Sequence, residues 1–471
     1  MRRSATIAAA LGMLAGCTAG PDYQRPSLQM PAAWQVEAPW REAAPRDDAP
    51  KGAWWKPFND GDLDGLEVRA LANSPTLAIS ASRVEQARAS LDAALAARFP
   101  QLFVGSRDQR FRITEERPLS NYATPQFSTV QNDFTLGVNA SYELDLAGRV
   151  RRSIQGARAS AEQTAADFEN TRLVLTADVA TAYFNLRALD IELDVLLRSI
   201  ALQRRALDLA TSRHDLGAAS GLDVAQQQAL LDSTLTQVDV LHKQRSQFEH
   251  ALATLIGTPA PSFSVVPEAT RAEPPAIPLG VPSDVLERRP DVASAERAMA
   301  AANAQIGVAA AALYPSITLA GSAGLENRDL ASLFSAPSAV WSIGASITQP
   351  LFDAGRLQAN VRFARAGYEA SVASYRRTVL TAMQEVEDGI TGLAALERAH
   401  AQAGAAVQSA ARVLDMANAR YEGGASGYLE VITAQQGLLN NERLRAQLQG
   451  QRLLTAVFLV KALGGGWTSV Q

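Results

Sequence analysis

The 471-residue sequence contains a single cysteine, Cys17, which excludes an internal disulfide and any zinc site built from several cysteines. Aromatic residues make up only 6% of the chain, while Ala, Leu, Gln and Arg crowd long stretches and favour helix. The net charge of −4, without a basic patch, argues against a nucleic-acid binder. No apolar run of about 18 residues follows the N-terminus, which excludes membrane-spanning helices in the mature chain.

Motifs of common enzymes and metal sites are also missing. The sequence has no Gly-x-Ser-x-Gly nucleophile turn and no phosphate-binding loop that ends in Lys-Ser or Lys-Thr. Its four histidines show no zinc-binding helical spacing. They are His214, His242, His250 and His400. We therefore expect no enzymatic activity, no cofactor and no metal.

The N-terminus has the layout of an export signal. Residues 1–16 begin with Arg2 and Arg3, continue through an apolar stretch and end in small residues, too short a segment to span a bilayer. The junction Leu14-Ala15-Gly16-Cys17 is similar to a bacterial lipobox, in which the cysteine becomes the acylated N-terminus of the mature protein. The alternative is an ordinary signal peptide with an incidental cysteine. Residues 17–57, rich in Pro and Trp, predict an extended tether.

The rest of the chain is a duplication. Arg213–Ala218 matches Arg420–Ala425, and Leu222–Val224 matches Leu429–Val431, always 207 residues apart. This constant offset divides the chain into a first repeat at 58–257, a Pro-rich linker at 258–289, a second repeat at 290–464 and a tail at 465–471.

Each repeat contains a long helix with an apolar seam. Apolar residues recur every seven positions from Val179 to Leu207, and a second row runs from Ala182 to Ala210 with one polar member, Gln203. The second repeat has the same pattern from Val372 to Tyr421. The first of these helices, at about 150–216, would be roughly 100 Å long at ~1.5 Å per residue.

Strands with a period of two precede these helices. From Phe134 to Leu146 every even position is apolar, and the odd positions, including Asn139 and Asp145, form a polar face. We predict strands at about 100–113, 132–147, 315–325 and 339–351. Strands of ~10 residues that alternate in this way are typical of membrane β-barrels, a soluble sandwich being the alternative. Four strands cannot close a barrel, so several chains must contribute.

Several motifs together resemble the TolC-like outer membrane factors, in the lipoprotein branch of NodT/OprM-like multidrug efflux channels. They are Gly20-Pro21-Asp22-Tyr23-Gln24-Arg25-Pro26, Trp54-Trp55 with Phe58, Arg83–Arg88, Arg288–Val292 and Tyr314-Pro315-Ser316. The resemblance implies a mainly α fold with a membrane β-barrel: a homotrimer with a 12-stranded β-barrel, four strands per chain, continued by a long α-helical barrel with a mixed equatorial region.

This resemblance also implies a function, location and partners. We expect a trimeric conduit of a tripartite efflux system, lipid-anchored in the outer membrane and extending into the periplasm. Its partners would be a periplasmic adaptor protein, an inner-membrane pump of the RND type and outer-membrane lipid, without nucleic acid. An exit duct for type I protein secretion shares the fold, and a structural coiled-coil lipoprotein is the alternative from another class.

The two corners where the long helices end are the candidate periplasmic gate. Gly217 and Gly424 can adopt the positive φ that ends a helix, after which Ser220 or Ser426 can cap the next one. The resemblance places Glu430 in a cation-attracting ring at the constricted tip. It further implies that Asp223 takes part in links between neighbouring helices and that Tyr421 takes part in links that close the tip. His214 occupies the place equivalent to Tyr421 in the first repeat and is the fourth candidate gate residue. The alternative is that both acids only balance the helix dipole. Since the family's second acid and basic residue are absent near Thr433 and Ser426, the closing links must differ in this chain.

Overall fold

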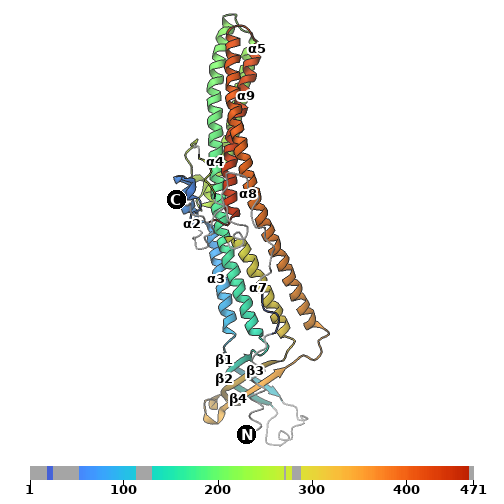
Figure 1. The fold of residues 1–471 in the computed structure, drawn as a ribbon. Coiled ribbons are helices and arrows are strands. Elements are labelled where there is room, and N and C mark those ends of the chain that lie inside the picture. The colour runs from blue at the N-terminus through green and yellow to red at the C-terminus, as the bar shows by residue number, and fades with distance from the viewer. Residues whose placement is uncertain (1–18, 25–51, 113–129, 270–271, 278–287, 466–471) are drawn as a thin grey trace. The chain divides into compact units, whose positions relative to one another are not determined.

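The duplication is visible in the lengths of the elements (Figure 1). The computed structural model describes residues 19–24, 52–112, 130–269, 272–277 and 288–465. Matching helices and strands have equal lengths in the two repeats, except that the second strand of the first repeat is longer than the second strand of the second repeat. The pairs are α3 (Pro75–Ala96) and α7 (Pro290–Ala311), β1 (Gln101–Arg112) and β3 (Ser316–Asn327), β2 (Val130–Leu144) and β4 (Ala339–Thr348), α4 (Arg149–Asp215) and α8 (Arg356–Glu422), and α5 (Gly221–Leu255) and α9 (Tyr428–Ala462). The first repeat is preceded by η1 (Lys56–Phe58) and α2 (Gly61–Asn73), while η3 (Ala260–Ser262), η4 (Leu330–Ser332) and η5 (Ala336–Ser338) are short 3-10 turns.

The chain forms two compact units, each of which combines segments from both repeats. The first unit comprises Met1–Pro26, Val84–Thr164 and Ala295–Tyr375, and the second comprises Ser27–Arg83, Ala165–Ser294 and Arg376–Gln471. The repeats therefore do not form separate bodies, because corresponding helices of the two copies pack within the same unit.

The first unit holds an antiparallel four-stranded sheet in the order β1-β2-β3-β4. Directly opposed residues share one face of a sheet, so the register assigns the faces. One row consists of Val104, Val138, Ala323 and Trp341. The adjacent row on the other face consists of Phe103, Asn139, Ser322 and Ser342. Trp341 is 78% exposed and Val104 is 77% exposed, so this chain leaves its apolar face uncovered. The predicted alternation thus holds in these central rows, with Phe103 as an apolar exception on the polar face. It fails toward the end of β1, where Asp108 and Arg110 fall on the apolar face.

The second strand ends earlier than the predicted 147. Its last residue is Leu144, because the Asp145 carboxylate accepts hydrogen bonds from the backbone N–H groups of Val150 (3.0 Å) and Arg151 (2.8 Å) at the start of α4. Asp145 therefore satisfies two of the N–H groups that a helix start leaves unpaired. The expectation that Asp145 belongs to the polar face of the strand is wrong.

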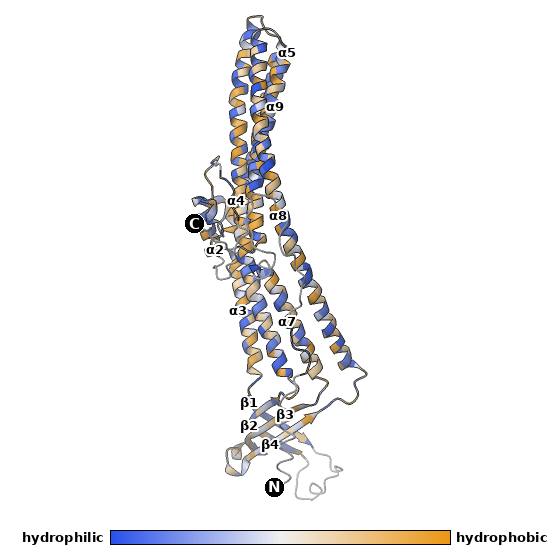
Figure 2. Cartoon of the chain, viewed as in Figure 1, coloured by the Kyte–Doolittle hydropathy of each residue, from blue (hydrophilic) through white to orange (hydrophobic). Residues whose placement is uncertain are grey.

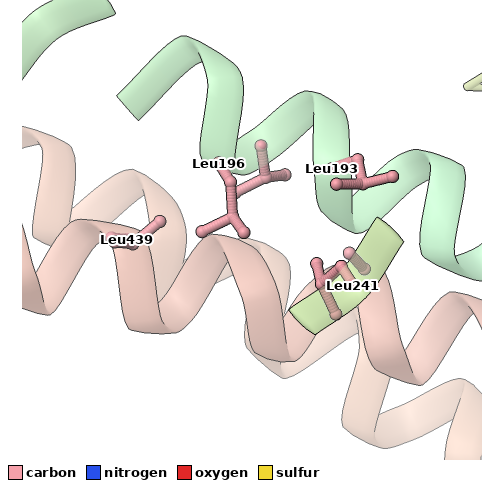
Figure 3. Close-up of a cluster of buried hydrophobic side chains, with 6 residues drawn as sticks. Leu193, Leu196, Leu241 and Leu439 are labelled. Carbon is pink, nitrogen blue, oxygen red and sulfur yellow. The ribbon is translucent and has the colours of Figure 1, made fainter. Parts of the chain in front are cut away.

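The predicted seams form the interior of the helical part of the second unit. In α4 the side chains of Val179, Leu186 and Leu193 are at most 5% exposed, and polar Gln203 is 1% exposed. Figure 3 shows Leu193 and Leu196 of α4 clustered with Leu241 of α5 and Leu439 of α9. Apolar and polar residues intermingle along every long helix (Figure 2). Within the described ranges, no helix combines the length and apolarity needed to cross a membrane.

Candidate gate at the helix ends

The two predicted corners end in the same way. Gly217 (φ 74°) and Gly424 (φ 72°) are in the left-handed region, as the sequence predicts. After α4, the N–H of Ala218 donates to the carbonyl of Arg213 at 2.7 Å, and after α8 the N–H of Ala425 donates to the carbonyl of Arg420 at 2.8 Å. These bonds satisfy carbonyls that the helix itself leaves unpaired. Both corners are therefore tight turns of defined geometry.

The caps of the two following helices differ. Ser220 caps α5, and Asp223 completes the capping box by accepting the N–H of Ser220 at 3.3 Å. The N-cap of α9 is Gly427, which has no side chain to offer, and the hydroxyl of Ser426 is buried without a partner. The prediction of a serine cap is confirmed for Ser220 and wrong for Ser426, which lies one residue before the cap.

Because the caps differ, the two predicted acids, Asp223 and Glu430, have different surroundings. Asp223 has a local structural role, because its carboxylate holds the backbone of the turn. Glu430 occupies the equivalent position in α9 without a capping partner. Its carboxylate lies 3.7 Å from the guanidinium of Arg420, and both side chains are at least half exposed. Such an exposed pair contributes at most ~1 kcal/mol, so Arg420 holds the Glu430 carboxylate only weakly.

Tyr421 and His214 also occupy equivalent positions with different surroundings. The Nδ1 atom of His214 lies 3.1 Å from the carbonyl oxygen of Ala219, inside its own turn. The ring of Tyr421 instead packs against Tyr428, with 4.9 Å between centroids, and the Arg213 guanidinium lies 4.8 Å from the centre of the Tyr421 ring. The latter contact joins the end of α4 to the end of α8 by a cation–π interaction.

A buried hydrogen-bond chain makes a second link between the two helix pairs. The Tyr428 hydroxyl donates to Gln227 Oε1 at 2.9 Å, and the amide of Gln227 donates to the carbonyl of Gln203 at 3.0 Å. Burial, together with the nearby Tyr421 and Asp223, raises the pKa of Tyr428 to about 12, so this hydroxyl stays protonated in neutral solution. Three helices, α9, α5 and α4, are thereby joined.

The sequence alone assigns no role to Arg213, Gln227 or Tyr428. Arg213 begins a duplicated motif and no motif marks Gln227 or Tyr428, but the alignment of the repeats carries a signal. Tyr428 is matched by Gly221 and Gln227 by Ala434, so the Tyr428–Gln227 hydrogen bond breaks the symmetry of the duplication. The surrounding core draws apolar residues from all four helices: Ala210, Val224, Leu414, Ala417, Val431 and Ala434.

Two further expectations concern lipidation and metal binding rather than the gate. Cys17 lies outside the described residues. In the part of the chain that the structure describes, no group of three or more His, Cys, Asp or Glu side chains is arranged to hold a metal ion.

Comparison with known proteins identifies relatives across the whole chain. A family model described as outer membrane efflux protein matches residues 66–258 and 281–465. The chain is 32% identical over 470 residues to the pyoverdine export outer membrane protein OpmQ of Pseudomonas aeruginosa, covering 100% of this chain and 98% of that protein. It is also 32% identical over 465 residues to the toluene efflux pump outer membrane protein TtgF of Pseudomonas putida, covering 97% and 95%. The solved structure of the outer-membrane channel OprN is similar with a TM-score of 0.86 at 28% identity, over 96% of this chain and 100% of that one.

These similarities confirm the predicted fold class, in which three chains each give four strands to a membrane barrel continued by a helical barrel. They also confirm the expected role, since the relatives are outer-membrane proteins of export and efflux pumps and a channel. The chain belongs to the outer membrane efflux protein family, and it is an efflux channel of the outer membrane.

Proposed function

We propose that this channel is lipid-anchored through Cys17 and receives small molecules from a periplasmic adaptor and an inner-membrane pump of the RND type. The lipobox-like sequence before Cys17 supports the anchor. The names of OpmQ and TtgF, which concern pyoverdine and toluene, support small molecules rather than proteins as the cargo.

The corners at the ends of α4 and α8 are the proposed periplasmic gate. In the closed state the Tyr428–Gln227 hydrogen bond and the Arg213–Tyr421 contact hold the two helix pairs of one chain together. Opening then requires that α8 and α9 separate from α4 and α5, which breaks both links. Since a buried hydrogen bond contributes only ~1 kcal/mol net, docking of a partner can supply this free energy.

Glu430 is the proposed selectivity residue of this gate. The observation that carries the assignment is its uncapped, half-exposed carboxylate, in contrast to the capping carboxylate of Asp223. Three-fold symmetry places three copies of Glu430 around one axis. A ring of carboxylates attracts cations and repels anions at a narrow aqueous mouth.

Single-channel recording of the purified trimer in planar bilayers tests this assignment. Hexamminecobalt(III), a trivalent cation, should block the current from the periplasmic side, and Glu430→Gln should remove most of this block. Asp223→Asn is the matched control, since it should weaken the capping box and lower thermal stability while leaving the block in place. If Glu430→Gln retains the block, the ring assignment is wrong.

A further inference from the structure

The residues after the lipidation signal lie against the first unit through a buried arginine. Arg152 of α4 is 3% exposed, and its guanidinium donates to the carbonyls of Ala19 (3.2 Å) and Gly20 (3.1 Å) and to the Asp22 carboxylate (2.9 Å). A fourth bond goes to Gln155 at 3.0 Å. Most of the acceptors of this buried charge therefore come from a segment more than 100 residues away in sequence.

Other contacts hold the same segment from both sides. The N–H of Ala19 donates to the carbonyl of Ala147 at 3.0 Å, and Asn303 of α7, which is 4% exposed, donates its amide to the carbonyl of Pro21 at 3.1 Å. The Tyr23 hydroxyl lies 3.5 Å from Glu296 Oε1 of α7. The segment thus bridges α4 and α7.

Two glycines make this close approach possible. Gly20 has φ +88°, and a Cβ built there would lie 2.7 Å from the Cα of Gly307. A Cβ on Gly307 would lie 2.6 Å from Cγ of Arg152. A larger residue at position 20 is excluded both by its backbone conformation and by the space available.

We propose that Arg152, Asn303 and Gly307 form a receptor site for the mature N-terminal segment, which recognises a Gly-Pro-Asp sequence through its carbonyls and its acid. Buried charges need partners, so the segment is required to complete the α4–α7 pair. Ala19 is bonded three residues beyond the end of β2, and Cys17 can be no more than about 7 Å from Ala19 along the chain. Docking thereby fixes where the lipid leaves the protein, a consequence that rests on the proposed acylation of Cys17.

Photo-crosslinking measures the docking directly. Benzoylphenylalanine in place of Tyr23 should crosslink to the α7 peptide that contains Glu296 in the purified trimer. Gly20→Ala and Arg152→Gln should each lower the yield by about tenfold, because charged hydrogen bonds and the close approach are lost. Gly61→Ala, where a Cβ would meet nothing within 4 Å, is the control and should not change the yield.

A Cys17→Ser variant carried by an ordinary cleavable leader separates docking from lipidation. This variant should retain the full crosslink, because docking does not need the lipid. A wild-type protein found without acyl chains would therefore overturn only the proposed anchor. Unchanged crosslinking in Gly20→Ala and Arg152→Gln, or its loss in Cys17→Ser, would overturn the receptor site.

The direction in which two helical glycine-to-alanine substitutions shift the melting temperature gives an independent test. Alanine normally stabilises a helix relative to glycine, and Gly437→Ala in α9 should raise or preserve the melting temperature. Gly307→Ala should lower it by several degrees, since its methyl group displaces Arg152. Equal shifts in the two variants would contradict the receptor site.

Discussion

Arg245 and Arg452 occupy equivalent positions in the two repeats, and each pairs with an acid 55 residues earlier in the chain. Arg245 Nε lies 2.7 Å from Asp190 Oδ1, and Arg452 binds Glu397. Both arginines also reach the linker between the repeats, Arg245 at the carbonyl of Val265 (2.7 Å) and Arg452 at the Glu273 carboxylate (2.9 Å). The duplication has therefore conserved an ion pair and its attachment to the linker.

The two pairs should differ in their contribution to stability. The Asp190 side chain is 2% exposed and also binds Arg187, whereas that of Glu397 is 58% exposed. Asp190→Asn removes the carboxylate that two buried guanidinium groups share. Arg187 keeps Asp62 and Arg245 keeps Glu249 as partners, so the loss should be about 2 kcal/mol. Glu397→Gln should cost less than about 1 kcal/mol. Thermal unfolding of the trimer measures both, and equal losses would contradict the difference in burial.

A buried carboxyl in α2 should make stability depend on pH. Glu67 is fully buried, neither of its oxygens has a partner, and burial, with Asp64 nearby, raises its pKa to about 9. The folded state therefore binds a proton that the unfolded chain releases above about pH 4.5, so this stability is lost as the pH rises toward 9.

Glu67→Gln removes this dependence. The variant should be more stable than the wild type at pH 7, by up to about 3 kcal/mol, and should show no such gain near pH 4. Melting curves between pH 4 and 9 measure the effect, with Glu85→Gln, an exposed acid of α3, as the control. A gain that does not change with pH would show that Glu67 is ionised in the folded state.

The faces of the sheet can be tested at adjacent residues of β2. Val138 belongs to the apolar row with Trp341, and Asn139 belongs to the polar row. Val138→Arg should cost about 2–4 kcal/mol if it faces the middle of the bilayer, while Asn139→Arg should be tolerated. The yield of heat-resistant trimer in outer membranes reports the difference. Equal tolerance would mean that this strand does not face lipid.

If the proposed links close the gate, variants that lose them should have leaky channels. Tyr428→Phe removes only the hydroxyl that binds Gln227, so it should raise conductance and sensitise cells to vancomycin, a large antibiotic. Tyr421→Phe should have a smaller effect, because the structure shows ring contacts for Tyr421 and its aromatic ring is preserved. Conductance and susceptibility that do not change in Tyr428→Phe would place the closing links elsewhere.

The lipid should be dispensable for assembly. Cys17→Ser, carried by a cleavable leader, should abolish acylation but leave trimers in the outer membrane, because the barrel rather than the acyl chains holds the protein there. Metabolic labelling with palmitate and membrane fractionation measure the two properties. Soluble monomers in the periplasm would contradict the proposed role of the barrel.

The sequence predicts those parts of this protein that depend on periodicity. The seam of α4 and the alternation of β2 follow from side-chain spacing, and positive φ at Gly217 and Gly424 follows from their place after a long helix. Contacts between distant segments are not encoded in any spacing. Gln227 binds Tyr428 across 201 residues, and Arg152 binds Asp22 across 130, so only the folded chain reveals these links. The alternation alone predicts too late an end for β2, because Asp145 continues the alternation although it caps α4.

Within the described residues, β1 and β4 each pair on one side only, so every chain brings two open strand edges to the barrel. Hydrocarbon does not tolerate unpaired strand edges, so subunits must close on one another before or as they enter the bilayer. Assembly is then all-or-none. A subunit with a damaged edge strand prevents barrel closure in every trimer that it joins. When cells make equal amounts of normal and damaged chains that mix at random, only about one trimer in eight is fully normal. Edge-strand variants should accordingly be dominant over the wild-type gene.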